Sequence, residues 1–387
     1  MPANFTQTDD HGILAIQHLR DGIRDGWIAA EPAILDAQLQ PASLDLRLGD
    51  RAYRVVSSFL PGPERTVEQK LDDLQRSQEM YELDLSKPTV LERGCVYIVP
   101  LAERLTLPDG VSGTASPKSS TGRLDVFTRL IVDRAAGFEQ VPAGYAGPMY
   151  LEIAPRTFSI VVRAGDRLNQ IRFRVGATGT SDRQLREAHD LDPVVFAGGA
   201  SAEAVIADGL WVSVDLAARG ADPVAYRARR HAPLLDLSKV AHYDPLDFWE
   251  PILGDATGRL ILNPDDFYLM ASREGVRVPP GYSAEMVPYD TAAGEFRVHY
   301  AGFFDPGFGH RGEGPGGTPA VLEVRSHEVP FALEHGQRVA RLKYERLLAV
   351  PDVLYGRDLG SNYAEQRLTL AKFFRPLAGR GGGVAGR

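Results

Sequence analysis

The sequence predicts an all-β protein with a few short helices, organised as two tandem copies of one domain. Three observations lead to this prediction. Short runs of β-branched and aromatic residues recur along the chain, 39 glycines and 27 prolines punctuate it, and several runs return in the second half in the same order. Short strands bounded by turn residues are typical of β-barrels and β-sandwiches.

The strongest strand signals lie in the first half of the chain. They are CVYIVPL (95–101), MYLEIA (149–154), FSIVVRA (158–164) and NQIRFRV (169–175). Helical periodicity is sparse. An amphipathic pattern predicts one helix over residues 13–28, and a second, on the surface, over residues 66–83.

An internal repeat organises the chain. Blocks of the first half align with blocks of the second at a single displacement of 171 residues, and in one order. The aligned blocks are 97–120 with 268–291, 149–153 with 320–324, and 165–173 with 336–344. Because one shared displacement rarely arises by chance, we interpret this as a duplicated β-domain. The predicted domains are residues 1–190, called the first half below, and residues 191–387, called the second half.

Composition excludes several classes of function. Forty-three Lys and Arg against 51 Asp and Glu give a net charge of −8, which argues against a partner that is a nucleic acid polymer. The only cysteine, Cys95, excludes an internal disulfide, an iron–sulfur cluster and a Cys-rich zinc centre. No apolar run is long enough to span a membrane and no secretory signal is evident, so we expect a cytoplasmic protein without a membrane partner.

The segment PKSSTGR (117–123) is a candidate phosphate-binding site in the first half. Lys118, Ser119, Ser120 and Arg123 combine two cations with two hydroxyl groups beside a glycine. Such donors, with exposed backbone N–H groups, suit a phosphate. The alternative is a polar surface turn. The second half has lost both cations from the corresponding segment, which begins at Tyr289.

A glutamate lies inside a predicted strand in each half. These are Glu152 in MYLEI and Glu323 in AVLEV. Because side chains alternate between the two faces of a strand, each glutamate either points into a site or lies on a solvated face. Its presence in both halves favours a site. Four histidines, at 299, 310, 327 and 335, have no spacing typical of a metal site, and we expect no protein-held metal.

Five motifs together resemble a known family. They are ASLDLRLG (42–49), SS-x-x-R (119–123), DPGFG (305–309), LE (322–323) and the Y-x-x-Q of NYAEQ (363–366). In this order they resemble the dCTP deaminases of the trimeric dUTPase-like superfamily, and in particular the long, duplicated form. The resemblance covers most of both halves.

The resemblance implies a fold, a reaction and a set of site residues. The fold is a β-clip or distorted β-barrel in each half. The reaction is hydrolysis of dCTP to dUTP and ammonia without zinc, with Mg²⁺ bound through the triphosphate. The catalytic residues it implies are Glu323, Glu152, Ser119 and Arg123. The substrate-binding residues it implies are Lys118, in place of the family's usual arginine, with Ser120, His299, Phe304, Asp305, Tyr363 and Gln366.

Each half alone lacks part of this set. The first half has neither the DPGFG turn nor the tail motif, and the second half has no SS-x-x-R segment. We therefore expect one composite site built from both halves. Whether the halves pair within one chain or between the chains of a homo-oligomer is left open. Two alternatives also remain: a dUTP pyrophosphatase, alone or combined with the deaminase, and a non-catalytic nucleotide-binding regulator.

Overall fold

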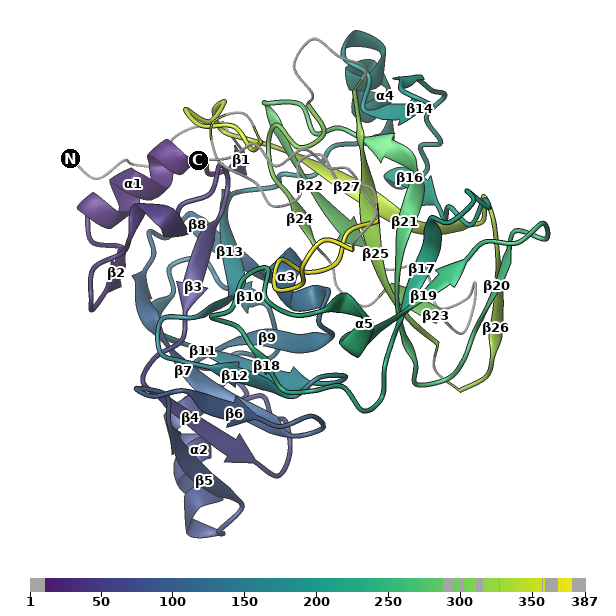
Figure 1. Cartoon of the computed structure of the whole chain (residues 1–387). Coiled ribbons are helices and arrows are strands. Elements are labelled where there is room, and N and C mark those ends of the chain that lie inside the picture. Colours follow the sequence, from purple (N-terminus) through teal and green to yellow (C-terminus); the bar gives the residue numbers. More distant parts are fainter. Residues whose placement is uncertain are drawn as a thin grey trace.

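The computed structural model describes residues 11–287, 296–298, 302–310, 316–326, 328–356, 358 and 368–377. Strands predominate among these residues and the helices are short, which confirms the predicted all-β class. Figure 1 shows the first half, in purple to blue, beside the second half, in green to yellow. Within the described part of the chain, no helix is long and apolar enough to cross a membrane.

Two antiparallel sheets form most of the first half. In one, β13 (Arg167–Val175) pairs with β1, β3 and β8, and β10 extends β8. In the other, β7 (Val96–Thr106) pairs with β2, β4 and β11, and β5 and β9 extend the sheet. The bounds of the other strands are β1 (Gly12–Ile13), β2 (Ile28–Ala30), β3 (Leu44–Arg47), β4 (Arg51–Val55), β5 (Met80–Asp84), β8 (Val111–Pro117), β9 (Val126–Val132), β10 (Gln140–Val141) and β11 (Ala146–Pro155).

The second half contains two further large sheets. One is centred on β21 (Phe267–Val276), which pairs with β14, β17 and β25, and the other on β27 (Arg338–Arg346), which pairs with β16 and β22. The other strands are β14 (Val195–Ala197), β15 (Ala200–Ser201), β16 (Leu210–Ser213), β17 (Pro223–Ala228), β19 (Trp249–Leu253), β20 (Arg259–Leu262), β22 (Tyr282–Val287), β23 (Phe296–Val298), β24 (Phe303–Phe304), β25 (Thr318–Ser326) and β26 (Phe331–Glu334).

One central strand pair has the same register in both halves. Glu152 on β11 lies opposite Ile98 on β7, and Glu323 on β25 lies opposite Leu269 on β21. Both members of the second pair are displaced by 171 residues from the first, which is the displacement found in the sequence. The repeat in the sequence therefore corresponds to a repeat in strand pairing.

The helices are shorter than the sequence pattern predicts. α1 spans Ile16–Arg24 because Gly12–Ile13 is drawn into β1, and because Gly26 adopts a positive φ of 80° beyond its end. α2 (Val67–Arg76) begins at the cap Thr66 and is followed by Gln78 at a φ of 59°. The chain then continues as the edge strand β5, so the predicted helix over residues 66–83 was too long.

The remaining helices are brief. α4 (Asp182–Leu191) lies at the junction of the halves, and Ser181 and Gln184 form a capping box at its start. The others are the 3₁₀ turn η2 (Asp36–Gln38), α3 (Ser119–Gly122) and α5 (Pro245–Phe248). Figure 1 shows α3 near the middle of the molecule, between the sheets of the two halves.

The hydrophobic core joins the halves. A small sheet contains β6 (Thr89–Leu91) and β12 (Ile160–Val162) from the first half and β18 (Leu235–Asp236) from the second. The ring of Phe158 packs edge-on against Phe248 and Trp249, with centroids 5.4 and 5.5 Å apart. Phe374, near the end of the described chain, packs 5.2 Å from Phe248. The segment 368–377 is thereby held in the aromatic cluster that joins the two halves.

Candidate active site

A cavity of about 450 Å³ lies where the halves meet. The first half contributes residues 117–124 together with Asp45, Asp166, Arg167 and Gln170. The second half contributes residues 302–305 together with Phe308, Val321, Glu323 and Lys372. The predicted residues Lys118, Ser119, Ser120, Arg123, Phe304, Asp305 and Glu323 all line this one cavity.

The segment PKSSTGR is a buried helical turn and not a surface turn. Pro117 ends β8, the backbone N–H of Lys118 donates to the carbonyl of Leu168, and Ser119–Gly122 form α3. Ser120 is 8% exposed and Arg123 is 3% exposed. The burial of these polar side chains in a concave wall favours the binding-site interpretation over the polar turn.

Glu323 lies against α3. Its strand β25 is buried along its length, and the glutamate side chain lines the cavity. Burial raises the pKa of Glu323 from its ordinary value of 4.5 to about 8, Arg123 opposes the rise, and Asp125 adds to it. A carboxyl group with such a pKa exchanges protons readily near neutral pH.

Arg123 is fixed by the second half of the chain. Its Nη1 donates to the carbonyl oxygen of Thr369 over 2.8 Å. Next to it, Asp125 bonds Arg325, which lies two residues beyond Glu323 on β25. These two contacts tie α3 and the strand that follows it to the elements that carry Glu323.

The cationic end of the cavity surrounds Asp45. This carboxylate bonds Lys118 and lies 3.5 Å from Arg167. Lys372, from the C-terminal segment, also lines the cavity. Burial lowers the pKa of Lys372, and the neighbouring charges of Lys118 and Arg167 lower it further. Three cations thus converge where an anionic ligand would relieve their mutual repulsion.

Asp305 opens the tight turn of the DPGFG motif. It directly follows β24, and its backbone carbonyl accepts a hydrogen bond of 3.0 Å from Phe308. Phe304 and Phe308 pack edge-to-face with ring centroids 5.0 Å apart. Gly307 and Gly309 hold positive φ angles of 96° and 75°. The turn presents Asp305 to the cavity from the second half.

Glu152 does not line the cavity. It is 1% exposed, and its carboxylate accepts from Arg129 at 2.6 and 2.9 Å and from Ser58. The guanidinium of Arg129 is in turn covered by the ring of Phe138, 3.5 Å away. The structure therefore separates the two glutamates: one lies in the cavity, and the other is fully engaged in an ion pair.

Sequence reasoning missed several cavity residues. Lys372, Arg167 and Asp166 belong to no recognisable motif, and only the docking of distant segments brings them together. Asp45 lies inside the ASLDLRLG block, and its position in that motif is a signal that could have identified it as a site residue. The predicted residues His299, Tyr363 and Gln366 lie outside the described residues.

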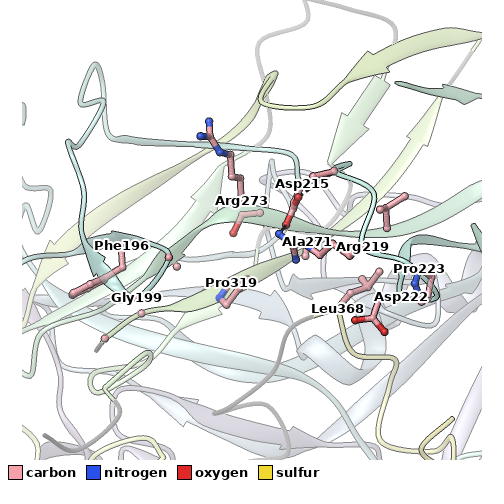
Figure 2. A pocket seen from close by; sticks show the side chains of 17 residues that line it. Phe196, Gly199, Asp215, Arg219, Asp222, Pro223, Ala271, Arg273, Pro319 and Leu368 are labelled. Atoms are coloured by element: carbon pink, nitrogen blue, oxygen red, sulfur yellow. Dashed lines mark hydrogen bonds and ion pairs between the residues drawn. The ribbon is translucent and has the colours of Figure 1, made fainter. Parts of the chain in front are cut away.

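A second hollow, of about 420 Å³, is lined by the second half alone (Figure 2). Its walls include the glycines at 198, 199, 275, 316 and 317, with Asp215 bonded to Arg219. Its lining also contains the hydroxyl group of Ser272 and the guanidinium groups of Arg219 and Arg273, but, among the described residues, none of the site residues predicted from the sequence. In the part of the chain that is described, no group of three or more His, Cys, Asp or Glu residues is arranged to hold a metal ion.

Comparison with known proteins identifies the family. Residues 10–177 match the N-terminal domain and residues 181–374 the C-terminal domain of 2′-deoxycytidine 5′-triphosphate deaminase (DCD). The chain is 51% identical to a 2′-deoxycytidine 5′-triphosphate deaminase from Agrobacterium tumefaciens of known crystal structure, with a TM-score of 0.82 over 87% of this chain and 99% of that one.

Shorter relatives match part of the chain. A "dCTP deaminase, dUMP-forming" from Beutenbergia cavernae is 30% identical over 162 residues, which are 42% of this chain and 78% of the relative. A "dCTP deaminase" from Halorubrum lacusprofundi is 28% identical over 163 residues, 42% of this chain and 76% of the relative. With both of its halves matched by the family's own domains, the chain belongs to the 2′-deoxycytidine 5′-triphosphate deaminase family.

Proposed function

We propose that this chain hydrolyses dCTP to dUTP and ammonia at the cavity between its halves, with Glu323 as the proton carrier and without a protein-held zinc ion. One observation carries the proposal: a buried carboxyl with a pKa of about 8 lies against the buried turn that contains Ser119 and Arg123. Family membership supports the choice of dCTP.

Within this proposal, Glu323 moves two protons. Its carboxylate takes one proton from water as the water oxygen bonds C4 of cytosine, and passes it to N3. A second proton, from the new hydroxyl group at C4, then reaches the amino group through the same carboxyl. The C4–N bond breaks, ammonia leaves, and C4 becomes a carbonyl beside a protonated N3. A single carboxyl can serve as base and acid in this way when its pKa lies near the working pH.

Ser119 and Arg123 would act on developing charge and on phosphate. Hydrogen-bond donors fixed in advance lower the barrier more than donors that must reorganise. The fixed position of Arg123, bonded to Thr369, suits this role. Serine hydroxyls in the same turn can also orient the attacking water.

The triphosphate fits the cationic end of the cavity. Lys118, Arg167 and Lys372 would neutralise part of its charge, and Asp45 holds two of these cations in place. Mg²⁺ would arrive as part of the substrate, bound to the phosphates. The proposed site is composite, since the cations and hydroxyls come mainly from the first half and Glu323 and Asp305 from the second.

A second candidate function is the combined reaction that ends at dUMP. It is favoured by the names of several relatives, among them the "dUMP-forming" proteins of Beutenbergia cavernae and Methanosphaera stadtmanae. One incubation separates the candidates: dCTP with Mg²⁺, followed by measurement of ammonia, dUTP, dUMP and pyrophosphate. Ammonia with dUTP supports the deaminase, and ammonia with dUMP and pyrophosphate supports the combined enzyme. Tight nucleotide binding without ammonia contradicts both and favours a regulator.

A further inference from the structure

Arg172 is a first-half residue whose described side-chain hydrogen bonds all go to the second half. It lies on β13 and is 2% exposed. Nη1 donates to the carbonyl of Ala284 over 3.0 Å. Nη2 donates to the carbonyl of Phe304 over 3.0 Å and to Oδ1 of Asp305 over 3.1 Å. One guanidinium thus links β22, β24 and the first residue of the DPGFG turn.

The guanidinium is also stacked. Its central carbon lies 4.0 Å from the centre of the Phe303 ring. Stacking on one face and hydrogen bonds at the edge leave the planar group little freedom to rotate. Its position therefore fixes the position of whatever it bonds, including the carboxylate of Asp305.

Asp305 depends on this partner. The carboxylate is buried, burial raises its pKa, and the charge of Arg172 is the main influence that opposes the rise. Oδ1 is bonded to Arg172, and among the described residues no donor bonds the other oxygen, Oδ2. A carboxyl group with one oxygen anchored and the other available is suited to form a hydrogen bond with a ligand in the cavity.

The repeat shows that this contact is peculiar to one pairing of the halves. At the displacement of 171 residues, Arg172 corresponds to Lys343, and Asp305 corresponds to Arg134. Lys343 is half-exposed and forms an ion pair of 3.1 Å with Asp208 at the surface. The buried arginine occurs only in the half that lacks the DPGFG turn, and it reaches the half that has the turn.

We propose that Arg172 is a positioning residue for nucleotide binding: it anchors Oδ1 of Asp305 across the junction of the halves so that Oδ2 is directed at the nucleoside. The proposal rests on the proposed function, because it takes the cavity to be the dCTP site. The first half would then contribute one more residue to the composite site, and this residue would act through Asp305 without contacting the substrate.

The test is steady-state deamination of dCTP by the full chain carrying Arg172→Gln, Arg172→Lys, Asp305→Asn, or Arg172→Gln with Asp305→Asn. Lys343→Gln is the matched control, since it removes the cation at the corresponding position of the repeat. The dissociation constant of dCTP with Mg²⁺, measured by calorimetry in a Glu323→Gln background, gives a readout that does not depend on turnover.

We expect Arg172→Gln to raise KM and the dissociation constant about tenfold with kcat changed less than about threefold, because uniform binding is lost. Lysine should rescue part of the loss, since it restores the charge but not the fork of donors. In the Asp305→Asn background, Arg172→Gln should add less than about threefold, because the two residues act as one unit. Lys343→Gln should match the unaltered chain.

A purely structural role for Arg172 predicts a different pattern. Loss of folded protein would lower the apparent kcat and the melting temperature and leave KM unchanged. The effects of Arg172→Gln would then add to those of Asp305→Asn. That pattern, or a normal KM in Arg172→Gln, overturns the proposal. If Arg172→Gln does not fold, a normal KM in Arg172→Lys overturns it. Absence of ammonia from the unaltered chain would instead contradict the proposed function, and the calorimetric comparison would still decide the role of Arg172.

Discussion

The carboxylate of Glu323 packs directly against Gly122, 201 residues earlier in the chain. A Cβ atom at position 122 would lie 2.9 Å from Oε1 and 3.0 Å from Cδ of Glu323. The glycine of the SSTGR segment therefore leaves room for the group that we propose as the proton carrier. At this point the turn from the first half and strand β25 from the second half are in direct atomic contact.

Gly122→Ala should lower kcat by about 10- to 100-fold while the chain stays folded, since small misplacements of a catalytic group carry large costs. The added methyl group meets the end of a flexible side chain, so the fold can yield by moving the carboxylate a few tenths of an ångström. Alanine is also the better helix former. Gly137→Ala, where nothing lies within 4 Å of the new methyl group, is the control. An unchanged kcat in Gly122→Ala would contradict the assignment of Glu323.

Glu323→Gln should reduce deamination by about 10²- to 10⁴-fold, the range for loss of a general acid–base group, while dCTP still binds. Glutamine keeps the shape of the side chain and removes its ability to carry a proton. Glu152→Gln is the matched comparison, at the corresponding position of the repeat and outside the cavity. It should retain turnover in whatever fraction remains folded, because Glu152 is bonded to Arg129. The reverse outcome would show that the halves were assigned wrongly.

Much of the first half's architecture could be predicted from local sequence. The strand signals at 95–101, 149–154 and 169–175 lie within β7, β11 and β13 or begin one residue before. The first two runs are mostly apolar, and polar and apolar residues alternate in the third from Gln170 to Val175, so the local pattern is enough to predict a strand in each case. The ends of α1 and α2 could not be predicted, because pairing with β13 and β4 draws neighbouring residues into strands.

Only those residues of the candidate site that belong to short sequence motifs could be predicted. Ser119, Arg123, Asp305 and Glu323 stand in short blocks with a recognisable chemistry. Arg172, Lys372 and Gly122 acquire their contacts from docking of the two halves, which no local pattern encodes. α4 is a different case, since Ser181 and Gln184 are a capping-box signal that can be read from the sequence alone.

Arg123→Ala should weaken dCTP binding or turnover by on the order of 2–5 kcal/mol, because it removes a desolvated partner of a buried charge. The side chain is 3% exposed and bonded to Thr369. Arg183→Ala is the control, since Arg183 is an exposed member of a surface pair with Glu187, where losses are close to zero. Both are measured as kcat/KM for dCTP with Mg²⁺. Equal kcat/KM values for the two variants would show that Arg123 does not contribute to the site.

Glu323 should make the unfolding free energy depend on pH in a defined direction. Its folded pKa of about 8 exceeds the ordinary 4.5, so the folded state holds the proton more tightly. The stabilisation is complete below about pH 4.5 and is lost as pH rises through 8. The unfolding free energy of the unaltered chain minus that of Glu323→Gln, measured in urea titrations, should therefore fall steadily from pH 5 to pH 8.5. A difference that is constant or rises would mean that Glu323 is ionised in the folded chain.

The final prediction concerns how the halves pair. One cavity contains Arg123 and Glu323 of the same chain, so each chain should form its own site. A mixture of Arg123→Ala and Glu323→Gln chains should then recover no activity, because each chain has one defect in its only composite site. The control is a demonstration that both variants are folded and that subunits exchange if the chain forms an oligomer. Recovery of activity would show that the working site pairs halves of different chains. Calorimetric titration should find one catalytic nucleotide site per chain. Two equivalent sites per chain would contradict the composite arrangement, because the second site would have to form around Glu152. In the structure Glu152 is instead bonded to Arg129 and Ser58.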